Sequence, residues 1–299
     1  MTTVFINGFG RIGRTVLRAW AQGGWPDIDI VGINDIADAD LCAHLFEYDS
    51  VFGPCAGKVY LEGTTLHVNG HAIPMHQTGD LRNLALHGVD LVMECTGKAD
   101  DRDVALRPLT AGARRVLISG PSDAADATIV IGANEGDLAN QQIISNASCT
   151  TNALAPLVRL LDDTWGVRTG WMTTIHCYTG SQPTIDAPRG DMLRSRAAAM
   201  SMVPTTTSAM RLLDHVLPDI AGRIEGAAVR VPVASVSAVD LTVTLQTTVT
   251  REQVIDLLSK PNPIIGCTDK PLVSSDLRAR PAARNPRDGP RIAAGLRLV

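Results

Sequence analysis

The chain is poor in aromatic residues and has neither a basic segment nor a long hydrophobic run, and each shortage excludes a class of protein. Aromatic residues make up 4% of the 299 residues and the formal net charge is −4, which excludes a basic, aromatic-rich surface for nucleic acid. No apolar run approaches the roughly 18 residues of a membrane span, and the start of the chain lacks the basic segment and cleavage site of a signal peptide. We expect a cytoplasmic protein that binds neither nucleic acid nor membranes.

Cysteine is also scarce, and its spacing excludes two further kinds of site. The six cysteines form no C-x-x-C pair, so the sequence indicates neither a zinc site nor a redox dithiol, and they are too sparse for a disulfide framework. Small buried cysteines are common in protein cores. We therefore predict no metal site and interpret five cysteines as core or incidental residues: Cys42, Cys55, Cys95, Cys177 and Cys267.

In the N-terminal half of the chain, short β-branched runs alternate with longer amphipathic runs. This pattern is typical of β-α-β units on a parallel sheet, with strands expected at 3–7, 29–34, 89–95 and 114–119 and helices at 11–22 and 39–48. Asn69-Gly70 predicts a hairpin with a type I′ turn. Long alternating runs at 222–233 and 236–249 favour a second domain with an antiparallel sheet. The boundary is expected near Ser148.

A glycine motif stands between the first expected strand and the first expected helix. Gly8, Gly10 and Gly13 form G-x-G-x-x-G, in which glycines allow a tight turn and bring backbone amides and a helix N-terminus close to a pyrophosphate. An acidic residue about 20 residues further on is expected to bind the adenine ribose, and Asp35 fits that position. Its charge would repel a 2′-phosphate, so the sequence predicts NAD rather than NADP as the cofactor.

The segment SNASCTTNALAPL places one cysteine at the start of an apolar run that is expected to be helical. A thiolate at a helix N-terminus is stabilised by the macrodipole and by unpaired backbone N–H groups, so Cys149 has the features of a nucleophile. The same segment also fits a purely structural role, with Ser148 as the N-cap. The segment alone leaves both interpretations open.

Seven segments, in this order and spacing, resemble the phosphorylating glyceraldehyde-3-phosphate dehydrogenase family. The resemblance covers roughly residues 3–277 and implies a doubly wound α/β NAD-binding Rossmann domain over residues 1–148. It also implies an α+β catalytic domain with a mostly antiparallel sheet over residues 149–277. The segments are INGFGRIGR, IND, ECTG, SNASCTTNALAP, TIHCYTGSQPTID, RSRAAAMSMVPTTTSA and AVRVPVASVSAVDLTV.

The resemblance implies a covalent mechanism on glyceraldehyde 3-phosphate. Cys149 would attack the aldehyde to give a thiohemiacetal, hydride would pass to NAD, and inorganic phosphate would cleave the resulting thioester to 1,3-bisphosphoglycerate. A thiol needs a neighbouring base for this chemistry, and His176 matches the family's base. The resemblance also implies a homo-oligomer, a tetramer in this family.

The resemblance assigns further binding residues. Arginine forks and hydroxyl groups suit the two phosphate groups involved. Ser208 departs from the family pattern, which usually has glycine there. If that position needs positive φ or close approach of the anion, serine would weaken phosphate binding. Thr179 and Arg230 would hold the phosphate of the substrate, and Ser148, Thr150, Arg194, Thr207 and Ser208 the attacking phosphate; the cofactor would contact Gly8, Gly10, Arg11, Ile12, Gly13, Asn34, Asp35, Thr96, Gly97 and Ser119.

Two alternatives stay open at this point. An erythrose-4-phosphate dehydrogenase is the nearest relative by substrate, although Tyr178-Thr179 looks like the glyceraldehyde-phosphate version. A catalytically impaired member that keeps only the fold and cofactor binding is the second. It is suggested by residues 278–299, which are rich in arginine and proline and lack the strand and helix with which the family continues. We expect an atypical tail there, disordered or frameshifted, with weak stability.

Overall fold

The computed structural model describes residues 1–262, 264–268 and 270–278, so the expectations for 279–299 lie outside the described residues. The chain divides into two compact units. The first comprises Met1–Ile129 and Gly136–Ala147, and the second comprises Val130–Glu135 and the chain from Ser148 onward. Residues 130–135 therefore belong with the second unit although they precede Ser148. No helix of the described ranges is long and apolar enough to cross a membrane.

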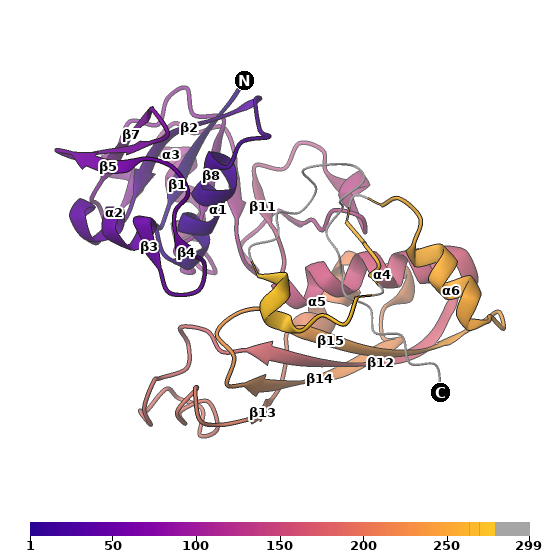
Figure 1. Ribbon diagram of the computed structural model, residues 1–299. Helices are drawn as coiled ribbons and strands as arrows, with labels where there is room; N and C mark the ends of the chain where they lie inside the picture. Colours follow the sequence, from indigo (N-terminus) through magenta and orange to yellow (C-terminus); the bar gives the residue numbers. More distant parts are fainter. Residues whose placement is uncertain (263, 269, 279–299) are drawn as a thin grey trace. The chain divides into compact units, whose positions relative to one another are not determined.

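The first unit is built on one large sheet (Figure 1). Its strand order is β10-β11-β9-β8-β1-β2-β7-β6-β5. Every pairing from β10 to β7 is parallel, and β5, β6 and β7 pair antiparallel. The strands are β1 Thr2–Asn7, β2 Ile28–Asn34, β5 Val59–Glu62, β6 Thr65–Val68, β7 His71–His76, β8 Leu91–Glu94, β9 Val116–Ile118, β10 Ala127–Thr128 and β11 Ile143–Ser145, and a separate short pair is formed by β3 Tyr48–Asp49 and β4 Gly53–Pro54.

The expected strands, helices and hairpin of this unit are confirmed. The helices are α1 Arg11–Ala21, α2 Ala39–Glu47 and α3 Arg102–Thr110. At the hairpin, Val68 pairs with His71, and both turn residues have positive φ, 52° at Asn69 and 88° at Gly70, as a type I′ turn requires. Apolar residues of β1, β2, α1 and α2 form the main core, including Ile6, Leu17, Ile33 and Phe46.

The second unit has a smaller sheet in the order β13-β14-β12-β15. Its outer pairings are antiparallel, as expected, but the central pair β12 and β14 is parallel. Residue alternation predicts which face a side chain occupies and carries no information on strand direction, which is why the sequence did not predict this pair. The strands are β12 Val167–Cys177, β13 Val203–Thr205, β14 Ile224–Val231 and β15 Ala238–Leu245.

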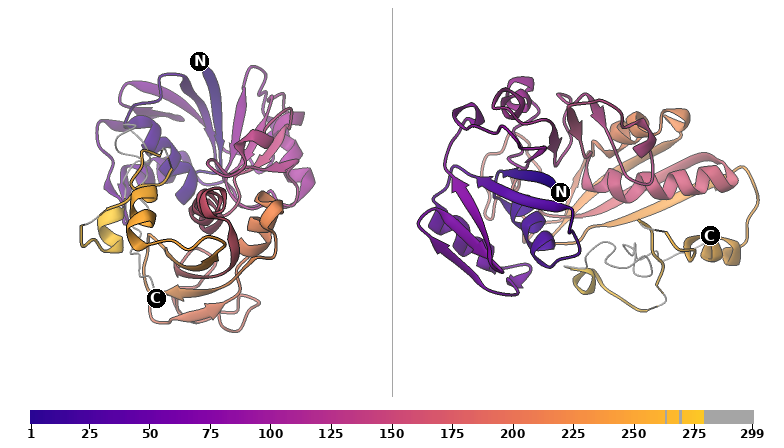
Figure 2. Two further views of the ribbon diagram at one scale, coloured as in Figure 1. Left: turned by 90° about the vertical axis from the view of Figure 1, so that its right-hand side faces the viewer. Right: turned by 90° about the horizontal axis from the view of Figure 1, so that it is seen from above.

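Helices cover one face of this sheet. Figure 2 shows α4 lying along it, and α5 packs against β14. The alternation of β12 places Met172, Thr174 and His176 on a buried face, whereas Trp171 and Ile175 are exposed on the other. The helices are α4 Cys149–Trp165, α5 Ala209–Val216 and α6 Arg251–Leu258, and short 3₁₀ turns occur in the chain as η1 Leu81–Asn83, η2 Glu135–Asp137, η3 Pro218–Ile220 and η4 Ser274–Leu277.

Candidate active site and cofactor site

The three glycines of the motif have different physical roles in the turn between β1 and α1. Gly8 has φ 92°, and a Cβ there would lie 2.7 Å from the backbone nitrogen of Thr96. A Cβ on Gly13 would lie 2.1 Å from the carbonyl oxygen of Gly8, whereas a Cβ on Gly10 would meet no protein atom within 4 Å. The first and third glycines therefore allow close backbone packing, and the second leaves open space beside the N-terminus of α1.

Asp35 lies against this turn at the end of β2. One carboxylate oxygen accepts a hydrogen bond from the backbone N–H of Phe9 at 2.6 Å, and the other accepts from Ala37 at 3.0 Å. Each carboxylate oxygen has a further lone pair, so the carboxylate can still accept ribose hydroxyl groups. The side chain of Asn34 is fixed by Asn7 at 2.8 Å and by the backbone of Thr78.

The other expected cofactor residues follow neighbouring parallel strands. Thr96 and Gly97 come after β8, and Ser119 comes after β9, so they lie at the same carboxyl edge as Gly8 and Asp35. Strand β1 pairs with β2 on one side and β8 on the other, and such a point of reversal is where open α/β sheets bind ligands. Arg11 and Ile12 are exposed in the first turn of α1.

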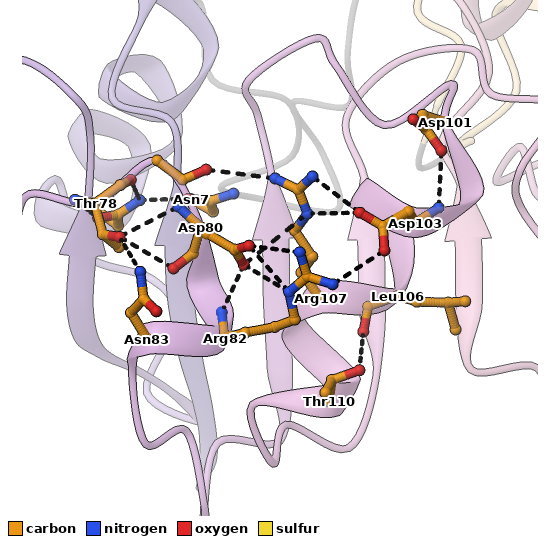
Figure 3. A network of polar contacts seen from close by, with 12 residues as sticks. Asn7, Thr78, Asp80, Arg82, Asn83, Asp101, Asp103, Leu106, Arg107 and Thr110 are labelled. Atoms are coloured by element: carbon orange, nitrogen blue, oxygen red, sulfur yellow. Dashed lines mark hydrogen bonds and ion pairs between the residues drawn. The ribbon is translucent and has the colours of Figure 1, made fainter.

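A polar network supports this edge of the first unit (Figure 3). Asp80 accepts hydrogen bonds from the backbone and guanidinium of Arg82, and these bonds lower the pKa of Asp80 to about 2. Arg82 also donates to Asp103, which accepts from Arg107. The network anchors the segment after β7, whose Thr78 holds Asn34.

In the second unit, Cys149 is the first residue of α4 and Ser148 is its N-cap. The Ser148 hydroxyl accepts a hydrogen bond from the backbone N–H of Thr151 at 3.0 Å. The serine caps the helix, and the exposed cysteine next to it lies at the positive end of the helix dipole. The structural role of Ser148 and a nucleophilic role of Cys149 are therefore compatible.

Cys149 and His176 form a hydrogen-bonded pair, with Sγ and Nε2 separated by 3.2 Å. Burial raises the pKa of the Cys149 thiol, but the hydrogen bond and charge of His176 and the hydroxyl and amide of Thr150 outweigh it, so that the pKa is lowered overall. The hydrogen bond to Cys149 raises the pKa of His176 to about 10. The two groups titrate as a unit, and both shifts favour a thiolate–imidazolium form of the pair.

The opposite side of the imidazole faces the carbonyl oxygen of Cys177. Nδ1 of His176 lies 2.6 Å from this oxygen, and the guanidinium of Arg230 donates to the same oxygen at 3.0 Å. Nη1 of Arg230 also lies 2.8 Å from Nδ1. In the imidazolium form, which carries a hydrogen on each ring nitrogen, Nδ1 donates to the Cys177 carbonyl and Nε2 donates to Cys149.

The expected phosphate-binding residues contribute two adjacent positive charges. Nε and Nη2 of Arg194 donate to the Thr205 hydroxyl at 2.9 and 2.7 Å. Burial and then the charge of Arg194 lower the pKa of Arg230. An anion bound near both guanidinium groups would offset the repulsion between their positive charges.

The remaining expected residues lie at the ends of neighbouring segments. The Thr207 hydroxyl accepts from the backbone N–H of Ala209 at the start of α5. Ser208 has φ −76°, so its backbone conformation does not require glycine. Thr179 is hydrogen-bonded to Ser181 at 2.9 Å; the described hydrogen bonds therefore link Cys149, His176 and Arg230 in one chain but do not join Thr179 to it.

Sequence reasoning missed three residues that hold the site residues in place. Thr205 orients Arg194, and Cys177 orients His176 through its main chain, which leaves no side-chain signal. Glu94 is 1% exposed and accepts hydrogen bonds from Asn7 and from the backbone of Thr96. A glutamate among the apolar residues of a predicted central strand was the available signal for this third residue.

Comparisons with known proteins identify the family to which both parts of the chain are similar. The NAD-binding domain model of glyceraldehyde 3-phosphate dehydrogenase matches residues 2–102, and the C-terminal domain model of the same enzyme matches residues 148–287. The chain is 45% identical over 287 residues to a glyceraldehyde-3-phosphate dehydrogenase of Xanthobacter flavus. This alignment covers 93% of this chain and 85% of that protein.

Two further relatives show the same extent of similarity. Glyceraldehyde-3-phosphate dehydrogenase 1 of Bacillus subtilis (strain 168) is 44% identical over 282 residues, and the enzyme of Geobacillus stearothermophilus is 45% identical over 282 residues; each alignment covers 91% of this chain and 84% of the relative. Residues 2–102, which lie in the first unit, thus match the family's NAD-binding domain. The chain belongs to the glyceraldehyde-3-phosphate dehydrogenase family.

Proposed function

We propose that the protein oxidises glyceraldehyde 3-phosphate to 1,3-bisphosphoglycerate with NAD and inorganic phosphate. The observation that carries the proposal is the 3.2 Å contact between Sγ of Cys149 and Nε2 of His176 at the N-terminus of α4. The names of the relatives support the choice of substrate.

Cys149 and His176 can perform every proton and bond change on the aldehyde. The thiolate attacks the aldehyde carbon, a C–S bond forms, and the oxygen takes the Nε2 proton of His176 to give a thiohemiacetal. NAD, when bound, supplies the acceptor for the hydride that leaves the carbon. As the C–H bond breaks, Nε2 takes back the hydroxyl proton and a thioester results. An oxygen of hydrogen phosphate then attacks the thioester carbon, the C–S bond breaks to restore the thiolate, and the proton of the phosphate passes to solvent.

The two phosphate groups would be held by the charges beside this pair. Arg230 and Thr179 would bind the phosphate of the aldehyde, with Arg230 fixed to the Cys177 carbonyl. The guanidinium of Arg194, held by Thr205, suits a tetrahedral anion. The attacking phosphate would contact Arg194 together with Ser148, Thr150, Thr207 and the backbone of Ser208.

The residues of the first unit fit the cofactor. The open space at Gly10 and the N-terminus of α1 would receive the pyrophosphate, and Asp35 would accept the ribose hydroxyls. Arg11, Ile12 and Gly13 would lie beside the pyrophosphate, and Asn34, Thr96, Gly97 and Ser119 would complete the site. Gly8 and Gly13 bring the turn close enough to the sheet for this.

We further propose a homo-oligomer, a tetramer by resemblance, in the cytoplasm. Trp171 and Ile175 are 50% and 43% exposed on the face of the catalytic sheet opposite Met172, Thr174 and His176, which gives one chain an apolar surface for another. The six cysteines all lie within the described ranges and are free thiols, which fits a reducing compartment. Light scattering of the purified chain would test the assembly.

The test of the proposed activity is NADH formation by the purified chain with each of two aldehydes, glyceraldehyde 3-phosphate and erythrose 4-phosphate. The proposal predicts a higher kcat/KM for glyceraldehyde 3-phosphate, a requirement for phosphate, and no activity in Cys149→Ala. A preference for erythrose 4-phosphate would reassign the substrate. A folded chain without turnover on either aldehyde would overturn the proposal in favour of an impaired family member.

A further inference from the structure

The loop between β14 and β15 contains a residue in an unusual conformation next to the catalytic strand. Val236 has φ 68°, a region that a β-branched residue adopts only when the surrounding structure imposes it. The pairing of β12 with β15 ends at the pair Ile175 and Ala238, and Ala238 follows Val236 by two residues. The conformation of Val236 therefore stops the strand pairing just where β12 reaches His176 and Cys177.

A side chain replaces the strand pairing at this point. The Ser237 hydroxyl accepts a hydrogen bond from the backbone N–H of Cys177 at 3.1 Å and donates one to the Cys177 thiol at 3.5 Å. A hydroxyl group can accept and donate at the same time, so one serine fixes both the main chain and the side chain of Cys177.

The same loop also fixes the other side of Cys177. The backbone N–H of Tyr178 donates to the carbonyl oxygen of Val233 at 3.0 Å. Because the peptide group is planar, this bond sets the direction of the Cys177 carbonyl, which lies in the same peptide plane. That carbonyl is the group that receives Nδ1 of His176 and the guanidinium of Arg230.

We propose that Ser237 is a positioning residue for the base: it holds Cys177 so that the Cys177 carbonyl receives the Nδ1 proton of His176 and Nε2 faces Cys149. The hydrogen bonds described for Ser237 go to Cys177, so the serine acts through Cys177. The inference rests on the proposed role of His176. It adds that the strength of the thiolate–imidazolium pair depends on a hydroxyl group outside the matched catalytic residues.

The test compares Ser237→Ala and Ser237→Thr with Ser235→Ala, a control that removes a hydroxyl group from the same loop. The rate at which iodoacetamide alkylates Cys149 is measured against pH, in the absence of substrate, with Cys149→Ala correcting for the other thiols. Loss of the hydroxyl group that holds Cys177 should lower the alkylation rate at pH 7 about fivefold in Ser237→Ala. The midpoint of the profile should move to higher pH, while Ser237→Thr and Ser235→Ala stay close to wild type.

Turnover supplies a second readout. In Ser237→Ala, kcat should fall by a similar factor while KM for the aldehyde stays within about twofold, because the serine does not contact substrate. An unchanged alkylation profile in Ser237→Ala would overturn the inference, and so would an equal shift in Ser237→Thr or Ser235→Ala. Alkylation requires no turnover, so a chain without dehydrogenase activity would refute the proposed function while this measurement still decides the role of Ser237.

Discussion

His176 and Arg230 occupy facing positions on the parallel strands β12 and β14, and both lie within hydrogen-bond distance of the carbonyl oxygen of Cys177. The proposed base and the proposed phosphate-binding guanidinium are thus placed by one pair of strands. A slip of one residue between these strands would turn one side chain to the opposite face relative to the other. The central parallel pair is therefore the part of the catalytic domain on which the site geometry depends most.

The first prediction concerns the ion pair. In His176→Asn the Cys149 thiol loses the partner that lowers its pKa, so the midpoint of alkylation should rise toward the ordinary value of about 8.5. Alkylation at pH 7 should slow by about tenfold or more, and turnover should fall by at least about a hundredfold. His215→Asn, a change at an exposed histidine of α5, is the matched control. Equal alkylation profiles for wild type and His176→Asn would contradict the assigned pair.

The second prediction separates two glycines of one motif. Gly13→Ala should lower the free energy of unfolding by about 1–3 kcal/mol, because the new Cβ would lie 2.1 Å from the Gly8 carbonyl oxygen. Gly10→Ala should leave stability nearly unchanged, since no protein atom lies within 4 Å, but should weaken NAD binding by about tenfold or more. Urea unfolding and NAD titration of both variants test this. The assignment of roles is wrong if Gly10→Ala loses stability and keeps its affinity.

The third prediction concerns the choice between NAD and NADP. Asp35→Asn keeps an oxygen for the backbone N–H of Phe9 but removes the charge that repels a 2′-phosphate. The ratio of kcat/KM for NADP to that for NAD should rise by about tenfold or more. Asp38→Asn removes a nearby charge of the same sign and should leave the ratio close to wild type. An equal change in both variants would mean that long-range charge, and not contact with the ribose, sets the preference.

The fourth prediction concerns the second phosphate. Thr205→Val removes the hydroxyl that accepts two hydrogen bonds from Arg194, so KM for inorganic phosphate should rise by about fivefold. Alkylation of Cys149 should not change. Thr206 contributes only its carbonyl oxygen to Arg194, so Thr206→Val is the control at the neighbouring position. A larger rise in KM for the aldehyde than for phosphate would place Arg194 at the other anion site.

Much of the fold could be predicted because its signals are local. Short β-branched runs located β1 and β2, and Asn69-Gly70 located the hairpin because its two positive φ angles suit few other residues. The direction of β14 against β12 could not be predicted, since parallel and antiparallel neighbours share the same alternation. Strands of two or three residues, such as β10 and β13, are too short for any periodic signal.

The site residues likewise divide into those that a local motif predicts and those that depend on the fold. Cys149 and Gly8 were found because their chemistry depends on a side chain, or on the lack of one, at a fixed place in a motif. Cys177 was interpreted as a core or incidental residue, and its thiol is indeed buried, but its carbonyl oxygen holds His176. A main-chain contact of this kind depends on where the chain folds back, which residue types do not specify.

The most direct test of the account is a rapid-mixing measurement of NADH formation with glyceraldehyde 3-phosphate and NAD in the absence of phosphate. If Cys149 forms a thioester that only phosphate cleaves quickly, wild type should give a burst of about one NADH per subunit and then stop. Addition of phosphate should start steady turnover, and Cys149→Ala should give no burst. Steady turnover without phosphate, or a burst in Cys149→Ala, would contradict the proposed covalent mechanism.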